Sequence, residues 1–133
     1  MLNELPVADI LIVEDETCLR ELLRMVLTRE GYAVRLVKNG QEAVDYLTAG
    51  GRPSLILLDM MMPVLDGPGF LGWFQMNAQL AGKPKIVVLS AFEPQTRPDM
   101  ALPGFDKVSA FVMKPVVVHE LLKAIRQILQ GDA

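Results

Sequence analysis

The fold of this chain is constrained most by four short runs of apolar residues without a polar interruption. The runs are residues 10–13 (ILIV), 55–58 (LILL), 86–89 (IVVL) and 110–113 (AFVM). Because apolar and polar residues do not alternate in them, they are typical of strands buried on both faces, as in a parallel sheet. A fifth run, residues 33–37, carries Arg35 at its centre and is more typical of an edge strand.

Amphipathic segments lie between the predicted strands. An apolar stripe at helical spacing before Gly31, a residue that suits a helix C-terminus, predicts the first helix. Its inward residues are Leu19, Leu22, Leu23, Val26 and Leu27. Asn39 and Glu42 resemble a capping box that opens a second helix, and residues 121–129 carry the apolar stripe of a final helix.

Two further helices are weaker predictions. Residues 70–74 suggest one helix, although Gly69 and Gly72 disfavour it. Residues 92–107 contain three prolines, and a proline inside a helix costs about 3 kcal/mol, so we expect a short or broken helix there.

The alternation of strands and helices predicts an α/β fold. We expect a three-layer, doubly wound, five-stranded parallel sheet with the flavodoxin-like strand order 2-1-3-4-5. The length of 133 residues fits a single domain that spans residues 1–133.

The composition narrows the classes of function. The net charge is −3, whereas a nucleic-acid-binding surface is normally basic, so no direct nucleic-acid binding is expected. Cys18 is the single cysteine, which excludes an intrachain disulfide and a cysteine-ligated zinc site and favours a reducing compartment. The sequence contains neither a signal-peptide pattern nor an apolar run of about 20 residues. We therefore expect a cytoplasmic protein without a membrane span.

Charged or hydroxyl residues come directly after four of the predicted strands. These residues are Glu14 and Asp15, Asp59, Ser90 and Lys114. The carboxyl ends of parallel strands meet at one edge of the sheet, where ligands bind in open α/β folds. Taken singly, Glu14, Asp15 and Ser90 fit structural roles as helix caps or turn formers. Asp59 and Lys114 lie in apolar segments, where an unpaired buried charge costs several kcal/mol, so we expect them to pair.

The three carboxylates at this edge outnumber the single lysine by two negative charges. Like-charged carboxylates raise each other's pKa values unless a cation intervenes, and a divalent ion would restore neutrality. An all-oxygen ligand set selects a hard cation such as Mg²⁺, which keeps positions open for phosphate oxygens. A carboxylate, a hard dication, an ammonium and a hydroxyl are the groups needed for phosphoryl transfer to an aspartate, which we predict to be Asp59.

The sequence around these residues resembles the response-regulator receiver domain of two-component systems. The matching motifs are residues 10–16 (ILIVEDE), 57–63 (LLDMMMP) with Asp66-Gly67, 88–91 (VLSA) and 111–115 (FVMKP). Each motif alone is weak, but the set is specific and its order covers essentially the whole chain.

The resemblance implies a role for each position. Asp59 would accept a phosphoryl group from the phosphohistidine of a histidine kinase or phosphotransfer protein. Asp15, Asp59 and the main-chain carbonyl of Met61 would bind Mg²⁺ directly, and Glu14 would act mostly through water. Lys114 would contact the phosphoryl oxygens.

The resemblance also implies a switch. Ser90 would hydrogen-bond the phosphoryl group after transfer, Phe111 would swing inward, and the Lys114–Pro115 peptide would be cis. The switched face would comprise the fourth helix, fifth strand and fifth helix, and would act on a downstream output protein or domain. Such a chain is no enzyme beyond its own phosphorylation and dephosphorylation, and is a monomer or a phosphorylation-dependent dimer. Met61 and Phe92 would flank Asp59, and we expect them to hinder water and lengthen the phosphoryl lifetime.

Other functions remain as alternatives. A pseudo-receiver would keep the fold as a phosphorylation-independent protein-binding module. A haloacid-dehalogenase-like phosphatase is disfavoured because Glu14 holds the nucleophile position of residues 13–17, and because the chain has no room for a cap domain. Dinucleotide binding is disfavoured because the first strand is not followed by a glycine-rich turn.

Overall fold

The computed structural model describes residues 8–79, 81–91 and 104–131. Its strands are β1 (Asp9–Val13), β2 (Ala33–Val37), β3 (Leu55–Asp59), β4 (Lys85–Ser90) and β5 (Val108–Met113). Its helices are α1 (Thr17–Arg29), α2 (Gly40–Thr48), α3 (Gly67–Asn77), the 3-10 helix η4 (Phe105–Lys107) and α4 (Val118–Leu129). All strand pairs are parallel, in the order β2-β1-β3-β4-β5, so the predicted flavodoxin-like topology is confirmed.

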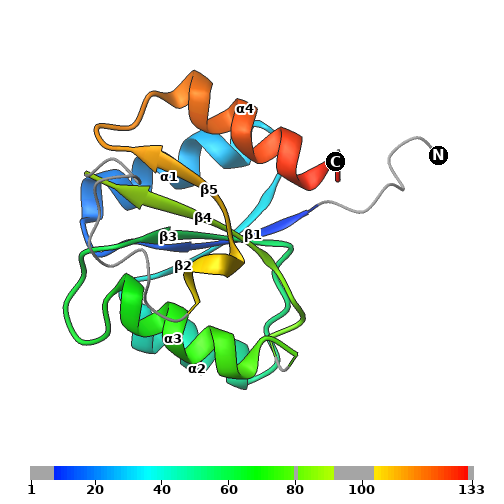
Figure 1. The fold of residues 1–133 in the computed structure, drawn as a ribbon. Helices are drawn as coiled ribbons and strands as arrows, with labels where there is room; N and C mark the ends of the chain where they lie inside the picture. Colours follow the sequence, from blue (N-terminus) through cyan, green and yellow to red (C-terminus); the bar gives the residue numbers. More distant parts are fainter. Residues whose placement is uncertain (1–7, 80, 92–103, 132–133) are drawn as a thin grey trace.

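The sheet forms the middle layer of three. Helices α1 and α4 cover one face, and α2 and α3 cover the other (Figure 1). Successive strand residues point to opposite faces, so each buried strand contributes to two separate apolar clusters. In β1, for example, Leu11 packs on the α2/α3 side and Ile12 on the α1/α4 side. The apolar runs that constrain the fold therefore supply residues to the apolar clusters on both faces of the sheet.

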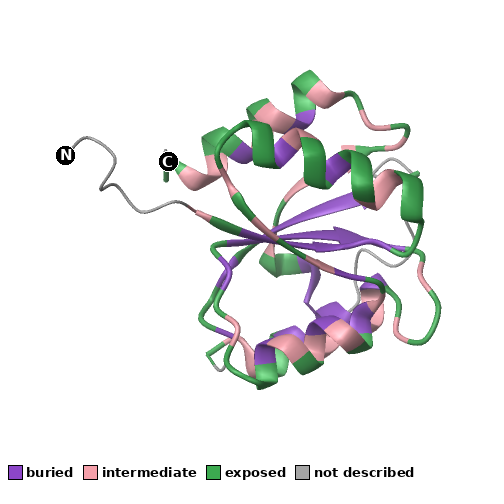
Figure 2. Ribbon diagram, turned by 180° about the vertical axis from the view of Figure 1, so that it is seen from behind, coloured by how far each residue is buried: buried purple, intermediate pink, exposed green. Residues whose placement is uncertain are grey.

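The central strands are buried except at the exposed first residues of β1 and β4, Asp9 and Lys85, whereas the two edge strands are mostly exposed or half-buried (Figure 2). The edge position of β2 agrees with the prediction from Arg35, which is exposed and lies 5.2 Å from the ring centroid of Tyr46. The prediction that residues 110–113 are buried on both faces is wrong. Because β5 is the other edge strand, Met113 is exposed and Phe111 is only half-buried.

The helix boundaries follow local capping. The Asn39 side chain accepts a hydrogen bond from the Glu42 amide (2.8 Å), and the Glu42 carboxylate accepts one from the Lys38 amide (2.8 Å). This is the predicted capping box with its return bond displaced by one residue. In α1, the prediction that Leu22 faces inward is wrong: it is 40% exposed, while Leu23 is buried.

The weaker helix prediction for residues 70–74 is confirmed by α3. Its N-cap Asp66 accepts a hydrogen bond from the Gly69 amide (2.9 Å), and Pro68 lies in the first turn, where a missing N–H costs nothing. Of the segment 92–107, residues 92–103 lie outside the described residues, and residues 105–107 form η4. None of the helices in the described ranges has both the length and the apolar character of a membrane span.

Candidate functional site

The first part of the site is the acidic pair that follows β1. The Glu14 amide donates to the Val37 carbonyl (3.2 Å), which extends the strand pairing by one residue and draws Glu14 into the protein. Glu14 is fully buried, and one of its carboxylate oxygens, Oε2, accepts a hydrogen bond from the Glu16 amide (3.1 Å). Asp15 is exposed. The two neighbouring carboxylates therefore have different surroundings.

Asp59 ends β3 and is 2% exposed. Its carboxylate oxygen Oδ1 accepts a weak hydrogen bond from the Met61 amide (3.4 Å). The amide of Met60, the residue directly after Asp59, continues the sheet by donating to the Leu89 carbonyl (3.2 Å). The strand thus holds Asp59 at the carboxyl edge of the sheet, as the sequence predicted.

Lys114 reaches Asp59 from the end of β5. Its Nζ lies 2.9 Å from Asp59 Oδ1 and 3.6 Å from Glu14 Oε1. Its main-chain amide donates to the Ser90 carbonyl (2.8 Å), which joins the last residue of β4 to the lysine. The predicted pairing of the two charges in apolar segments is present, and Lys114 also faces a second carboxylate.

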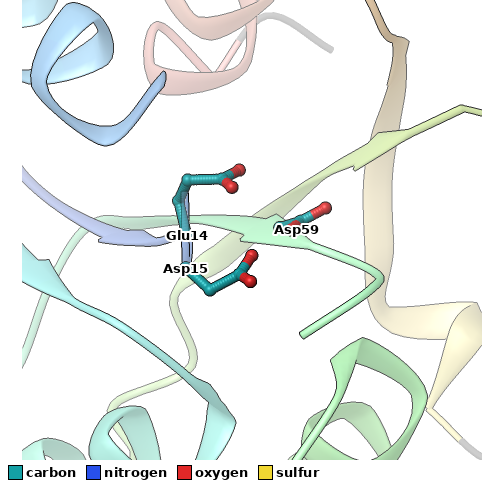
Figure 3. A group of neighbouring side chains, drawn as sticks. All are labelled: Glu14, Asp15 and Asp59. Carbon is teal, nitrogen blue, oxygen red and sulfur yellow. The ribbon is translucent and has the colours of Figure 1, made fainter. Parts of the chain in front are cut away.

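Three carboxylates converge beside the lysine. Glu14 and Asp15 extend from the end of β1 toward Asp59 (Figure 3), and one oxygen of each lies within 4.8 Å of the others. Glu14 Oε1 is buried and accepts no hydrogen bond from any residue in the described ranges. A buried carboxylate oxygen without a donor, beside two more carboxylates, fits a hard divalent cation.

The burial of the charged cluster changes the pKa values of its members. Burial is the largest influence on the pKa of Glu14 and, with the charge of Asp59, raises it from 4.5 to about 7 against the hydrogen bond from Glu16. Burial also raises the pKa of Asp59, although Lys114 opposes it. Burial lowers the pKa of Lys114, but its hydrogen bond and charge interaction with Asp59 outweigh burial and leave that pKa raised. In the absence of a cation, the cluster therefore takes up a proton readily at neutral pH.

The loop after Asp59 forms one wall of an open depression of about 350 Å³ beside the site. The lining residues are Asp15, Met60, Met61, Met62, Pro63 and Asp66. The loop is anchored to α2, because the Gly40 amide donates to the Leu65 carbonyl (2.8 Å) at a position where any side-chain carbon would collide with that carbonyl. Val64 has a positive φ of 70°, and its side chain is exposed.

The remaining predicted positions lie nearby. Ser90 is buried at the end of β4, in register with Met113 of β5. The Phe111 ring stacks on that of Phe105, with centroids 6.4 Å apart and planes 7° apart. The Lys114–Pro115 peptide is cis, as the resemblance implied. Phe92 lies outside the described residues.

Arg20 is a neighbour of the site that the motifs did not predict. Its guanidinium Nη1 donates to the carbonyls of Glu14 (2.9 Å) and Asp15 (3.2 Å). The one signal for it in the sequence is its place in the first turns of the helix that follows the acidic pair.

Comparison with known proteins identifies the family. Residues 10–126 match the family model described as the response regulator receiver domain. The chain belongs to this family. The chain is 35% identical over 122 residues to the response regulator MprA of Mycolicibacterium vanbaalenii and 33% identical to that of Mycobacterium tuberculosis. The matches cover 91% of this chain and 50% of each relative, so the receiver spans about half the length of these relatives.

Solved receiver structures share the fold. The receiver domain of a signal transduction histidine kinase from Syntrophus aciditrophicus aligns with a TM-score of 0.81 and 28% identity, over 95% of this chain and 92% of that one. The receiver domain of the sensor histidine kinase PA1611 from Pseudomonas aeruginosa aligns with a TM-score of 0.77 and 29% identity, over 96% and 100% of the two chains. That structure holds a magnesium ion in its active-site cleft. Phosphoryl acceptance in two-component systems is general for this family, and the acidic cluster of this receiver is compatible with Mg²⁺.

Proposed function

We propose that Asp59 is the phosphoacceptor of this receiver, and that its donor is the phosphohistidine of a histidine kinase or phosphotransfer protein. The observation that carries the proposal is the 2.9 Å contact between Asp59 and Lys114 in a pocket that two further carboxylates share. An Asp59 oxygen would attack phosphorus while the bond from phosphorus to the imidazole nitrogen breaks. The imidazole keeps the electron pair, and an acyl phosphate forms.

The two oxygens of Asp59 have different surroundings that suit this attack. Oδ1 accepts hydrogen bonds from both Lys114 and the Met61 amide, whereas no described residue donates to Oδ2. We therefore propose Oδ2 as the attacking oxygen. Lys114 would then hold the carboxylate in place before transfer and neutralise the phosphoryl oxygens after it.

The residues suited to hold Mg²⁺ are Asp15 and Asp59 directly, the main-chain carbonyl of Met61, and Glu14 mostly through water. When bound, the ion would supply positive charge to the phosphoryl oxygens during transfer. The buried oxygen of Glu14, which has no donor among the described residues, supports this assignment, because a cation and its waters would satisfy it.

The switch would use the connection between Ser90 and Lys114. The Ser90 hydroxyl would hydrogen-bond the new phosphoryl group, and Phe111 would move inward. The hydrogen bond from the Lys114 amide to the Ser90 carbonyl supports a coupled movement of the two strand ends. The altered face would include β5 and α4, which is the fifth helix of the predicted order, together with the predicted fourth helix in the segment 92–107.

We further propose that residues 1–133 form one receiver domain that acts in the cytoplasm. Its partners would be the phosphodonor and a downstream output protein or domain, without nucleic-acid or membrane binding by this chain. It would be a monomer or a phosphorylation-dependent dimer, and it would catalyse only its own phosphorylation and dephosphorylation. The alternative is a pseudo-receiver that binds proteins without phosphorylation.

Incubation with Mg²⁺ and acetyl phosphate, followed by intact mass measurement, tests the proposal. We expect a phosphoryl adduct in the wild type and in Asp66→Asn, which changes an exposed carboxylate of the same depression. Asp59→Asn and wild type with a chelator should show none. If neither acetyl phosphate nor any histidine kinase or phosphotransfer protein yields an adduct, the chain is a pseudo-receiver.

A further inference from the structure

The guanidinium of Arg20 makes hydrogen bonds to the turn that carries the acidic pair, Glu14 and Asp15. Nη1 donates to the main-chain carbonyls of Glu14 (2.9 Å) and Asp15 (3.2 Å), and Nη2 donates to the Thr17 hydroxyl (3.3 Å). Arg20 itself is held in α1, where its amide donates to the Glu16 carbonyl (2.9 Å). One side chain thus connects the end of β1 to the first turn of α1.

The two carbonyls lie between the end of the strand and the start of the helix. They precede the N-cap Glu16, so the helix supplies no amide to them, and β1 has already ended at Val13. On the other side of the turn, the Glu16 amide is bound by the Glu14 carboxylate (3.1 Å). The turn is therefore fixed from both sides, by Arg20 at its carbonyls and by Glu14 at its amide.

A fixed turn matters for Asp15 in particular. Its side chain is exposed, and no described residue makes a hydrogen bond to its carboxylate, so its direction depends on the backbone that carries it. The guanidinium fork suits this task because it presents several donors in a rigid plane, which a lysine ammonium does not.

We propose that Arg20 is a positioning residue for the divalent cation, acting through the main chain of Glu14 and Asp15 to aim the Asp15 carboxylate at the site. This inference rests on the proposed function, because it assumes that the carboxylate cluster binds Mg²⁺. Mg²⁺ requires nearly ideal octahedral geometry, so a looser turn weakens binding even when every carboxylate is still present.

The test compares Mg²⁺ affinity, measured by calorimetric titration, among matched variants. Loss of outer-shell support typically weakens metal binding by about 10–100-fold, so we expect Arg20→Met to raise the Kd about 10-fold. Arg20→Lys should stay close to Arg20→Met, because it restores the charge without the fork. The control is Arg24→Met on the same helix, whose guanidinium pairs with Glu21 (2.7 Å) at the surface and should leave the Kd unchanged.

A second readout separates positioning from loss of fold. In acetyl phosphate reactions, Arg20→Met should raise the Mg²⁺ concentration for half-maximal rate while the rate at saturating Mg²⁺ stays within about 2-fold of wild type. Thr17→Val removes one acceptor of the fork and keeps the side-chain shape, so it should show a smaller change in the same direction. It serves as the deciding variant if Arg20→Met does not fold.

The possible outcomes are distinct. An unchanged Kd in both Arg20 variants overturns the inference. If the Arg20 variants do not fold, an unchanged Kd in Thr17→Val overturns it. A full return to wild-type affinity in Arg20→Lys also overturns it, because the role of Arg20 would then depend on its charge. A lower melting temperature with an unchanged Kd also overturns it. If wild type and Arg24→Met themselves do not bind Mg²⁺, the proposed function has failed, and the inference fails with it.

Discussion

Lys114 Nζ and Asp59 Oδ1 lie 2.9 Å apart although 55 residues separate them in sequence. The attraction between the two charges offsets the free-energy cost of burying each of them in an apolar part of the sheet. The same lysine also faces Glu14 Oε1 at 3.6 Å. The pair is therefore the point where stability and the proposed phosphoryl chemistry depend on the same atoms.

Removal of the lysine should damage both properties. Lys114→Met leaves Asp59 and Glu14 buried without their cation, so we expect a loss of about 2 kcal/mol in the free energy of unfolding at pH 8. The loss should shrink at pH 5, where the carboxylates can protonate. Urea denaturation at both pH values measures this, with exposed Lys123→Met as the control. We also expect phosphorylation from acetyl phosphate to fall at least 10-fold. An equal loss at both pH values would contradict this explanation.

The raised pKa of Glu14 predicts a pH-dependent stability in buffer without divalent cations. Its folded pKa of about 7 lies above the ordinary 4.5, so folding favours the neutral acid. The stability that this provides is complete below about pH 4.5 and is lost as the pH rises through 7. Since one pKa unit corresponds to about 1.4 kcal/mol, the cost above pH 7 is about 3 kcal/mol.

Glu14→Gln removes that cost without changing the shape of the side chain. We expect the variant to be about 1–3 kcal/mol more stable than wild type at pH 8 and to show no gain near pH 4. Urea denaturation in the presence of a chelator measures the difference, and exposed Glu120→Gln is the control. Added Mg²⁺ should reverse the order, because wild type binds the ion more tightly. A gain of the same size at both pH values would exclude titration of Glu14 as the cause.

Val64 should be a site where substitution stabilises the protein. Its φ of 70° lies in the left-handed region, which costs a β-branched residue about 1–2 kcal/mol. The side chain is 78% exposed, so little packing is lost on replacement. Val64→Asn should therefore raise the free energy of unfolding by about 1 kcal/mol. Val64→Ala is the control, because alanine keeps a Cβ and pays nearly the same cost in the left-handed region. If both variants behave alike, backbone strain is not the reason.

Met61 should lengthen the life of the phosphorylated state. It is 70% exposed and lines the depression beside Asp59, where an apolar side chain hinders an attacking water. We expect Met61→Asn to speed autodephosphorylation several-fold, measured by the decay of the phosphoryl adduct. Met76→Asn, at an exposed methionine on α3, should not change the decay. Phe92→Ala tests the other predicted flanking residue. Unchanged decay in both Met61→Asn and Phe92→Ala would show that these side chains do not control water.

The sequence alone determined the sheet and the polar residues that meet at its edge. Unbroken apolar runs favour parallel strands, and the polar residues after them, such as Asp59 and Lys114, then meet at one edge. The pairing of these two charges followed from the cost of burying either one alone. These features depend on the order of residues along the chain and on the regular geometry of parallel strands.

Only the tertiary structure decided what depends on neighbours from other elements. The partial exposure of residues 110–113 comes from the edge position of β5, and the exposure of Leu22 comes from the rotation of α1 against the sheet. Whether Glu14 is buried, and so has a pKa near 7, depends on the strand β2 beside it. The hydrogen bonds of Arg20 to the turn after β1 are accepted by main-chain carbonyls. Every residue type has such a carbonyl, so the residue types in the turn do not reveal this contact. The sequence therefore placed the charged groups at the edge of the sheet, and the packing of helices and edge strands set their exposure, protonation and direction.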